Sequence, residues 1–99
     1  MVRQSKLTRV EVTSVLEDCL GFLSKGHGPR SVHPSLDVLL EWSLDSEHGV
    51  ELACDLSTRL GIEIPDNENP LIEENLATKK KRARTFGEVV DYLLKLSET

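Results

Sequence analysis

The sequence is 99 residues long, 38% hydrophobic, and carries a formal net charge of −5 at pH 7. This length predicts one domain over residues 1–99, and the acidic balance argues against nucleic acid as a partner. No apolar run is long enough to span a membrane and no secretory signal is visible at the N-terminus, so we expect a cytoplasmic protein.

Acidic residues are concentrated in the middle of the chain. Section 37–74 holds eleven acids and one base, a net charge of −10, whereas the sections on either side of it are weakly basic. We expect a strong negative potential over this section, which would steer basic partners toward it.

The cysteines and histidines do not indicate a metal or catalytic site. Cys19 and Cys54 each lie on the apolar side of a helical pattern, which predicts buried thiols rather than a disulfide or a metal pair. The three histidines add no metal-ligand spacing, and no Gly-rich phosphate loop, catalytic triad or zinc motif is present. We therefore expect no metal site, no catalytic residue and no enzymatic activity.

The first helix is predicted over residues 8–24, after a polar lead (1–7) that we expect to be mobile. Thr8 followed by Glu11 is a capping box, the side-chain signature of a helix start. Apolar residues then recur at three- and four-residue steps, as on the buried face of a helix. These positions are Val12, Val15, Leu16, Cys19, Leu20, Phe22 and Leu23. Two glycines and a proline within 26–29 end the helix.

A long connection follows the first helix. Its leucines have helical spacing, and Pro34 suits a helix start, which together predict one or two turns across 35–41. We expect Trp42 and Leu44 to fold inward after these turns.

The second main helix is predicted over 46–60, with Gly61 as its C-cap. Its expected buried stripe is Val50, Ala53, Leu56 and Leu60, with Leu52 and Cys54 at the borders. Gly49 costs about 1 kcal/mol against Ala inside a helix. In the first turn it would leave the backbone near Ser46 open to approach.

Three acids form a row on this helix, because Glu47, Glu51 and Asp55 are spaced at i, i+4 and i+8. Like charges at that spacing repel each other, by a few tenths of a kcal/mol per pair. Local helix stability therefore does not explain the row, which is either a solvated face or a docking face.

The C-terminal third is predicted to contain a short helix over 69–80 and a last helix over 85–97. Asn69-Pro70 suits a helix start, and Thr85 followed by Glu88 is a second capping box. No useful alternating strand pattern is present, so we expect an all-α fold: a small four-helix bundle of three main helices and the short one.

Ser46 is the candidate functional residue. With Asp45 it opens the second helix, where a phosphate on the serine oxygen would lie beside unpaired backbone N–H groups and the positive end of the helix dipole. Asp45-Ser46, then Val50-Glu51-Leu52, then residues 60–66 and 85–93 resemble the acyl carrier protein family in order and spacing.

The resemblance implies that Ser46 accepts 4′-phosphopantetheine from coenzyme A, with Asp45 helping to position the metal used by the phosphopantetheinyl transferase. It also implies that the row of Glu47, Glu51 and Asp55 is a docking face for acyl-transferring and chain-building enzymes with basic patches. An acyl pocket would be lined by the apolar residues Leu39, Leu40, Val50, Leu56, Ile62, Ile64, Ile72 and Leu76. We expect the protein to be a monomer.

Three departures from the family pattern indicate an atypical member. Glu47 and His48 follow the serine where the family usually has Leu and an acid, Ser43 replaces a usual Gly, and the region between Pro65 and Thr85 is extended. We therefore expect a specialised carrier for lipid or cell-envelope (lipopolysaccharide-type) acyl transfer rather than for housekeeping fatty-acid synthesis.

Two other functions stay open. The cargo of the carrier would be a polyketide or an aminoacyl or peptidyl group in one of them. In the other, the chain is a helical interaction module without a prosthetic group, and the basic run from Lys79 to Arg84 binds an acidic partner or nucleic acid. In the carrier itself, the extended segment that holds this run could contact anionic lipid headgroups.

Overall fold

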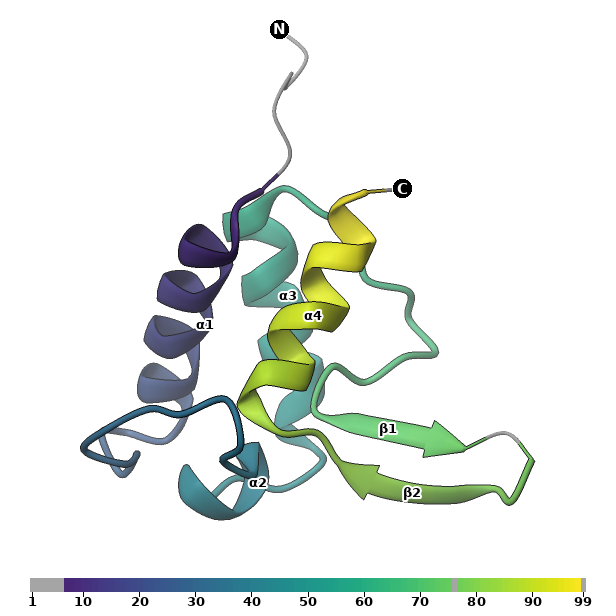
Figure 1. The fold of residues 1–99 in the computed structure, drawn as a ribbon, viewed down its shortest axis with the longest axis horizontal. Helices are drawn as coiled ribbons and strands as arrows, with labels where there is room; N and C mark the ends of the chain where they lie inside the picture. Colours follow the sequence, from purple (N-terminus) through teal and green to yellow (C-terminus); the bar gives the residue numbers. More distant parts are fainter. Residues whose placement is uncertain (1–6, 76, 99) are drawn as a thin grey trace, which may run out of the picture.

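The computed structural model describes residues 7–75 and 77–98. Its elements follow in the order α1 (Arg9–Leu23), α2 (Val38–Glu41), α3 (His48–Leu60), β1 (Ile72–Asn75), β2 (Lys80–Ala83) and α4 (Phe86–Ser97) (Figure 1). The described chain is therefore mostly helical, with one small antiparallel sheet that the sequence analysis did not predict.

Helices α1 and α4 both start at the predicted capping boxes. The Thr8 hydroxyl accepts the Glu11 N–H at 3.1 Å, and the Glu11 carboxylate accepts the Thr8 N–H at 3.0 Å. Thr85 and Glu88 repeat this exchange at 3.3 and 2.9 Å. Each exchange satisfies two backbone donors that a helix start leaves open, which explains why these two starts are readable in the sequence.

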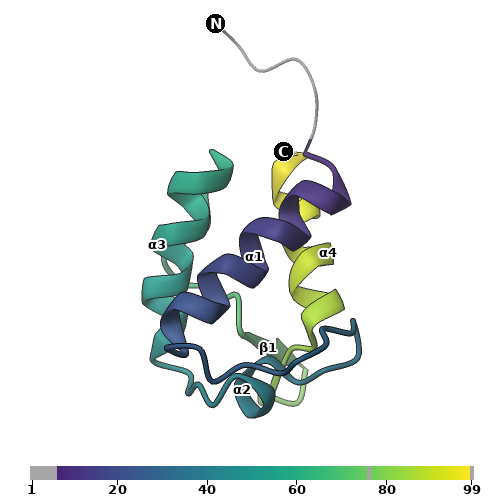
Figure 2. The same ribbon diagram turned by 90° about the vertical axis from the view of Figure 1, so that its left-hand side faces the viewer.

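The three long helices form the body of the fold. Helix α1 runs antiparallel to α3 and α4 and packs against both, and α2 lies at the end where α3 and α4 begin (Figures 1 and 2). Trp42 and Leu44 are buried, as predicted, and the Trp42 ring stacks on Phe86 with 5.7 Å between centroids. The predicted turns across 35–41 are confirmed as α2, which Asp37 caps by accepting two backbone N–H groups.

The buried face of α3 differs from the predicted stripe. Its buried residues are Gly49, Leu52, Leu56 and Leu60, whereas Val50 is 72% exposed. Both sets have helical spacing, but the observed face buries the larger Leu52 in place of Val50 and so removes more apolar surface from water. The predicted C-cap is confirmed, since Gly61 has the left-handed φ of 67°.

The predicted helix over 69–80 is wrong, and the chain there begins the β1–β2 hairpin. Asn69 does accept a backbone N–H, that of Leu71 at 2.9 Å, but an extended strand follows instead of a helical turn. Across the hairpin, Glu73 pairs with Arg82 and Glu74 with Lys81. Opposite charges that suited the two ends of a helix therefore suit facing positions of two strands equally well.

Some smaller predictions also need correction. Cys19 is buried but Cys54 is exposed, and Phe22 of the first helix's stripe is 78% exposed. Of the lead that was expected to be mobile (1–7), only Leu7 lies within the described residues, and it is buried in the core. No helix in the described ranges is long and apolar enough to cross a membrane.

Candidate functional site

Ser46 lies in the turn that precedes α3, and its side chain faces solvent. Asp45, Ser46 and Glu47 are all exposed. The Asp45 carboxylate accepts the Glu47 N–H at 2.9 Å, an Asx turn that sets the direction of the chain into the helix. Within 7–75 and 77–98, no hydrogen bond engages the Ser46 hydroxyl. The residue therefore presents an unoccupied nucleophilic oxygen.

His48 completes this turn. Its Nδ1 accepts the Asp45 N–H at 3.1 Å, the position that Glu takes in the capping boxes of α1 and α4. Accepting this hydrogen bond requires Nδ1 without a proton, so the Asp45 carboxylate 3.2 Å away from it is a neighbour rather than an ion-pair partner in that state. The departure from the family pattern at His48 thus has a structural role at the start of α3.

The N–H groups at the start of α3 already have partners. Those of His48 and Gly49 donate to the carbonyls of Asp45 and Ser46, both at 3.1 Å, and that of Glu47 is bound by Asp45. The expectation that a phosphate on Ser46 would lie beside unpaired N–H groups is therefore wrong for these residues. Beyond the dipole of α3, positive charge for an anion at Ser46 would come from side chains.

Asn69 fixes the turn from the other side. Its Nδ2 donates to the Ser46 carbonyl at 2.9 Å, and its side chain fills the space that a Cβ at position 49 would take. Gly49 therefore accommodates Asn69, and the backbone near Ser46 is covered rather than open as expected. The segment before the hairpin is thus joined directly to the candidate site.

Arg84 and Tyr92 hold that segment against α4. Arg84 Nη1 donates to the carbonyls of Asn69 and Pro70 at 3.1 and 3.3 Å, and the guanidinium carbon lies 4.2 Å from the centre of the Tyr92 ring. The Tyr92 hydroxyl donates to Glu68 at 2.6 Å. Burial, followed by the Glu68 carboxylate, raises the pKa of Tyr92, so its hydroxyl stays a donor at neutral pH.

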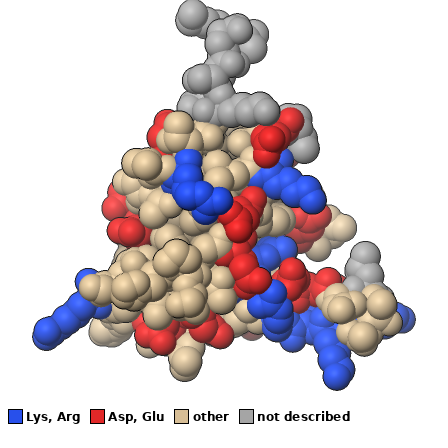
Figure 3. Space-filling view, in the orientation of Figure 1, with Lys and Arg blue, Asp and Glu red and all other residues tan. Residues whose placement is uncertain are grey.

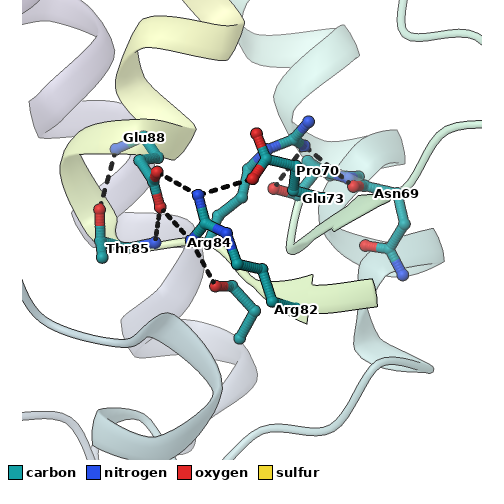
Figure 4. Close-up of polar contacts among 8 residues, drawn as sticks. Asn69, Pro70, Glu73, Arg82, Arg84, Thr85 and Glu88 are labelled. Carbon is teal, nitrogen blue, oxygen red and sulfur yellow. Dashed lines mark hydrogen bonds and ion pairs between the residues drawn. The ribbon is translucent and has the colours of Figure 1, made fainter. Parts of the chain in front are cut away.

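Arg82 fastens the hairpin to α4. Its guanidinium lies between Glu73 of β1 (2.6 Å) and Glu88 of α4 (2.5 Å), while Arg84 turns toward the Asn69 and Pro70 backbone (Figure 4). Arg82, together with the Thr85 N–H, lowers the pKa of Glu88 to about 2. The carboxylate is therefore ionised at every physiological pH.

A cavity of about 710 Å³ opens beside Ser46, between the start of α3 and the hairpin. Three carboxylates, two basic side chains and one apolar side chain share its wall with Ser46 and two asparagines. These residues are Glu47, Glu68, Glu74, Lys81, Arg84, Ile72, Asn67 and Asn69. Residues up to 38 positions apart in the chain are thus brought to one site, and its basic and amide side chains fit a polar, phosphate-bearing group attached to Ser46.

The predicted docking row is partly exposed. Glu47 and Glu51 are exposed and Asp55 is half-buried. None of the three carboxylates forms an ion pair with another described residue.

The structure does not gather the predicted acyl-pocket residues around one cavity. Ile72 lines the cavity at Ser46, whereas Val50 and Ile64 line a second cavity of about 470 Å³ between α3 and residues 64–69. Leu56 is buried in the core, Leu39 and Ile62 pack against the core, and Leu40 is 74% exposed. Leu76 lies outside the described residues.

The residues that join the site together were missed in the sequence. Asn69 was interpreted as a helix cap, and Lys81 and Arg84 as part of one basic run, because their roles depend on a hairpin that was not predicted. In the described chain, no group of three or more His, Cys, Asp or Glu side chains is arranged to hold a metal ion. Neither a protein-family model, nor a curated protein, nor a solved structure matches the chain.

Proposed function

We propose that this chain is a non-enzymatic carrier of the acyl carrier type, with 4′-phosphopantetheine attached to Ser46 by a phosphopantetheinyl transferase. The observation that carries the proposal is the exposed Ser46 hydroxyl before α3, which no described residue binds, beside a polar cavity. Asp45 and His48 make the hydrogen bonds that hold this turn, so the serine oxygen is not used as a cap and is left available.

The attached group supplies a flexible arm whose thiol carries acyl groups as thioesters. The chain itself contributes the serine oxygen, which forms the new bond to phosphorus. The P–O bond within the pyrophosphate of coenzyme A breaks, adenosine 3′,5′-bisphosphate leaves with the bridging oxygen, and the hydroxyl proton passes to a base of the transferase. Asp45 keeps the turn in shape through its bond to the Glu47 N–H. By the family resemblance, its carboxylate also helps position the transferase's metal.

The exposed acids of α3 support docking of basic partner enzymes. Glu47 follows Ser46 directly and Glu51 lies four residues further on. Neither has a partner among the described side chains, so their charge is available to another protein. We propose Glu47, Glu51 and Asp55 as the surface that positions partner enzymes over the loaded serine.

The cargo is proposed to be an acyl group for lipid or cell-envelope transfer, supported by the apolar side chains of Val50, Ala53 and Ile64 in the second cavity. A polyketide or aminoacyl cargo is the second candidate, because Ile72 is the one apolar residue among those that line the cavity at Ser46. Mass spectrometry of the protein isolated from its native host distinguishes the two, since the thioester mass identifies the cargo.

The interaction-module alternative loses part of the charge on which it relies. Arg82 is bound to Glu73 and Glu88, and Arg84 to backbone carbonyls, so three lysines of the basic run are left. On the hairpin side, basic side chains are interleaved with acidic ones (Figure 3, lower right) rather than forming a uniform patch.

The test is incubation with coenzyme A and a broad-specificity transferase, followed by mass spectrometry. Wild type should gain the mass of one phosphopantetheine, and Ser46→Ala should gain none. The matched control is Ser43→Gly, which removes an exposed serine three residues away and suits the φ of 55° there. A wild type that stays unmodified with several transferases, or a Ser46→Ala protein that is still modified, overturns the proposal.

A further inference from the structure

The two faces of the hairpin carry different groups. Because side chains alternate along a strand and facing residues of an antiparallel pair share a face, Glu74 and Lys81 point to one side, and Asn75 and Lys80 to the other. The cavity at Ser46 is lined by Ile72, Glu74 and Lys81, all from the first side. The hairpin therefore has an inner face toward Ser46, made of these three residues, and an outer face away from it.

Lys81 is the available cation of this inner face. No described side chain forms an ion pair with it, although Glu74 stands opposite across the hairpin. The second basic residue of the cavity, Arg84, already donates to the Asn69 and Pro70 carbonyls and lies over the Tyr92 ring.

An anion on Ser46 would need such a cation. The N–H groups of Glu47, His48 and Gly49 are already bound, and the carboxylates of Glu47, Glu68 and Glu74 line the same cavity and repel negative charge. Glu68 accepts the hydrogen bond of the Tyr92 hydroxyl. Lys81 is thus the group that makes an acidic cavity tolerate a phosphate.

We propose that Lys81 is the counter-ion of the phosphate carried by Ser46, and that the inner face of the hairpin binds the phosphate-bearing end of the arm. This inference rests on the proposed carrier function and adds to it a role for the hairpin. The arm then starts against β1 and β2, and the hairpin sets the direction in which the arm leaves the protein.

The chain offers a matched control for the test. Lys80 and Lys81 are neighbours of equal charge, both exposed, and differ in the hairpin face on which they lie. The experiment compares wild type, Lys81→Gln, Lys81→Arg and Lys80→Gln, each unloaded and loaded, with mass spectrometry to establish loading and circular dichroism to establish folding. The readouts are the ³¹P resonance of the attached phosphate and the amide resonances of the hairpin.

In wild type, loading should shift the amide resonances of Ile72, Glu74 and Lys81. Lys81→Gln should reduce these shifts by more than half and move the ³¹P resonance toward its position in urea-unfolded protein. Lys80→Gln and Lys81→Arg should behave as wild type. The difference between Lys81→Gln and wild type should shrink at about 1 M salt, where charges are screened within roughly 3 Å.

The outcomes separate the two proposals. If loaded Lys81→Gln and Lys80→Gln give the same spectra, or if loading of wild type shifts no hairpin amide, Lys81 is not the counter-ion and the carrier function stands. If wild type gains no phosphopantetheine at all, the carrier function fails and the inference fails with it.

Discussion

The starts of α3 and α4 use different side chains to bind their backbone N–H groups. At α4, the hydroxyl of Thr85 binds the Glu88 N–H and is occupied as a cap. At α3, Asp45 and His48 make the corresponding bonds, and the Ser46 hydroxyl between them makes none within the described chain. Asp45 thus takes the position that Thr85 takes at α4, and the Ser46 hydroxyl, one residue further on, is not needed as a cap.

The largest effect is expected where α3 meets Asn69. Gly49→Ala should displace the Asn69 side chain, and crowding typically costs about 1–3 kcal/mol, partly offset by the roughly 1 kcal/mol that Ala gains over Gly in a helix. We expect a net loss of roughly 1 kcal/mol in the free energy of unfolding, measured with urea.

A double-mutant cycle tests the cause of that loss. In an Asn69→Ala background the added methyl group has room, so Gly49→Ala should there be neutral or stabilising. An equal cost in both backgrounds would contradict the proposed contact.

Removing the hydroxyls of Thr85 and Ser46 in turn tests the difference between the two helix starts. Thr85→Ala should lower the free energy of unfolding by about 1 kcal/mol, because it removes a cap. Ser46→Ala should change it by less than about 0.5 kcal/mol, as for a surface residue without partners. Equal losses in thermal or urea unfolding would mean that Ser46 also serves as a cap.

A smaller effect is expected for His48→Ala, which removes the acceptor of the Asp45 N–H. An exposed hydrogen bond of this kind contributes roughly 0.5 kcal/mol, and the exchange of the Asp45 amide hydrogen should become faster. His27→Ala, at an exposed histidine outside the site, is the control and should change neither quantity.

The last prediction concerns the stability that Glu88 contributes at the start of α4, which does not change near neutral pH and falls only in acid. The folded-state pKa of Glu88 is lowered from 4.5 to about 2, mainly by Arg82, so the stability it contributes is present above about 4.5 and is lost as pH falls toward about 2. Hydrogen exchange of the hairpin amides should therefore be constant from pH 5 to 8, after correction for intrinsic rates, and accelerate in that acid window. Arg82→Gln should weaken the response and leave only the part due to the Thr85 N–H, and a response at neutral pH would count against the assignment.

Features that depend on a few neighbouring residues could be predicted from the sequence. The two capping boxes, the turns at 35–41 and the Gly61 cap each depend on contacts inside one helical turn. The position of Ser46 at a helix start was predicted for the same reason, although the helix itself begins two residues later, at His48.

The remaining features depend on contacts between distant segments. The Asn69 hydrogen bond to Leu71 opens both a helix and an Asx turn, so it could not distinguish helix from strand. Likewise, the separation of Lys81 from Lys80 follows from a strand register, which a run of consecutive basic residues does not reveal. The contact of Gly49 with Asn69, twenty residues away, is not visible in the helical spacing of α3.

The ends of the hairpin lie next to each other, since the Arg84 N–H donates to the Leu71 carbonyl at 2.8 Å. A segment with adjacent entry and exit points can be excised or exchanged with little change in the entropy of closing the loop. For protein engineering, residues 72–83 are thus a cassette: foreign hairpins could be grafted there while the helices keep their places, and each graft would give the same serine a different neighbour.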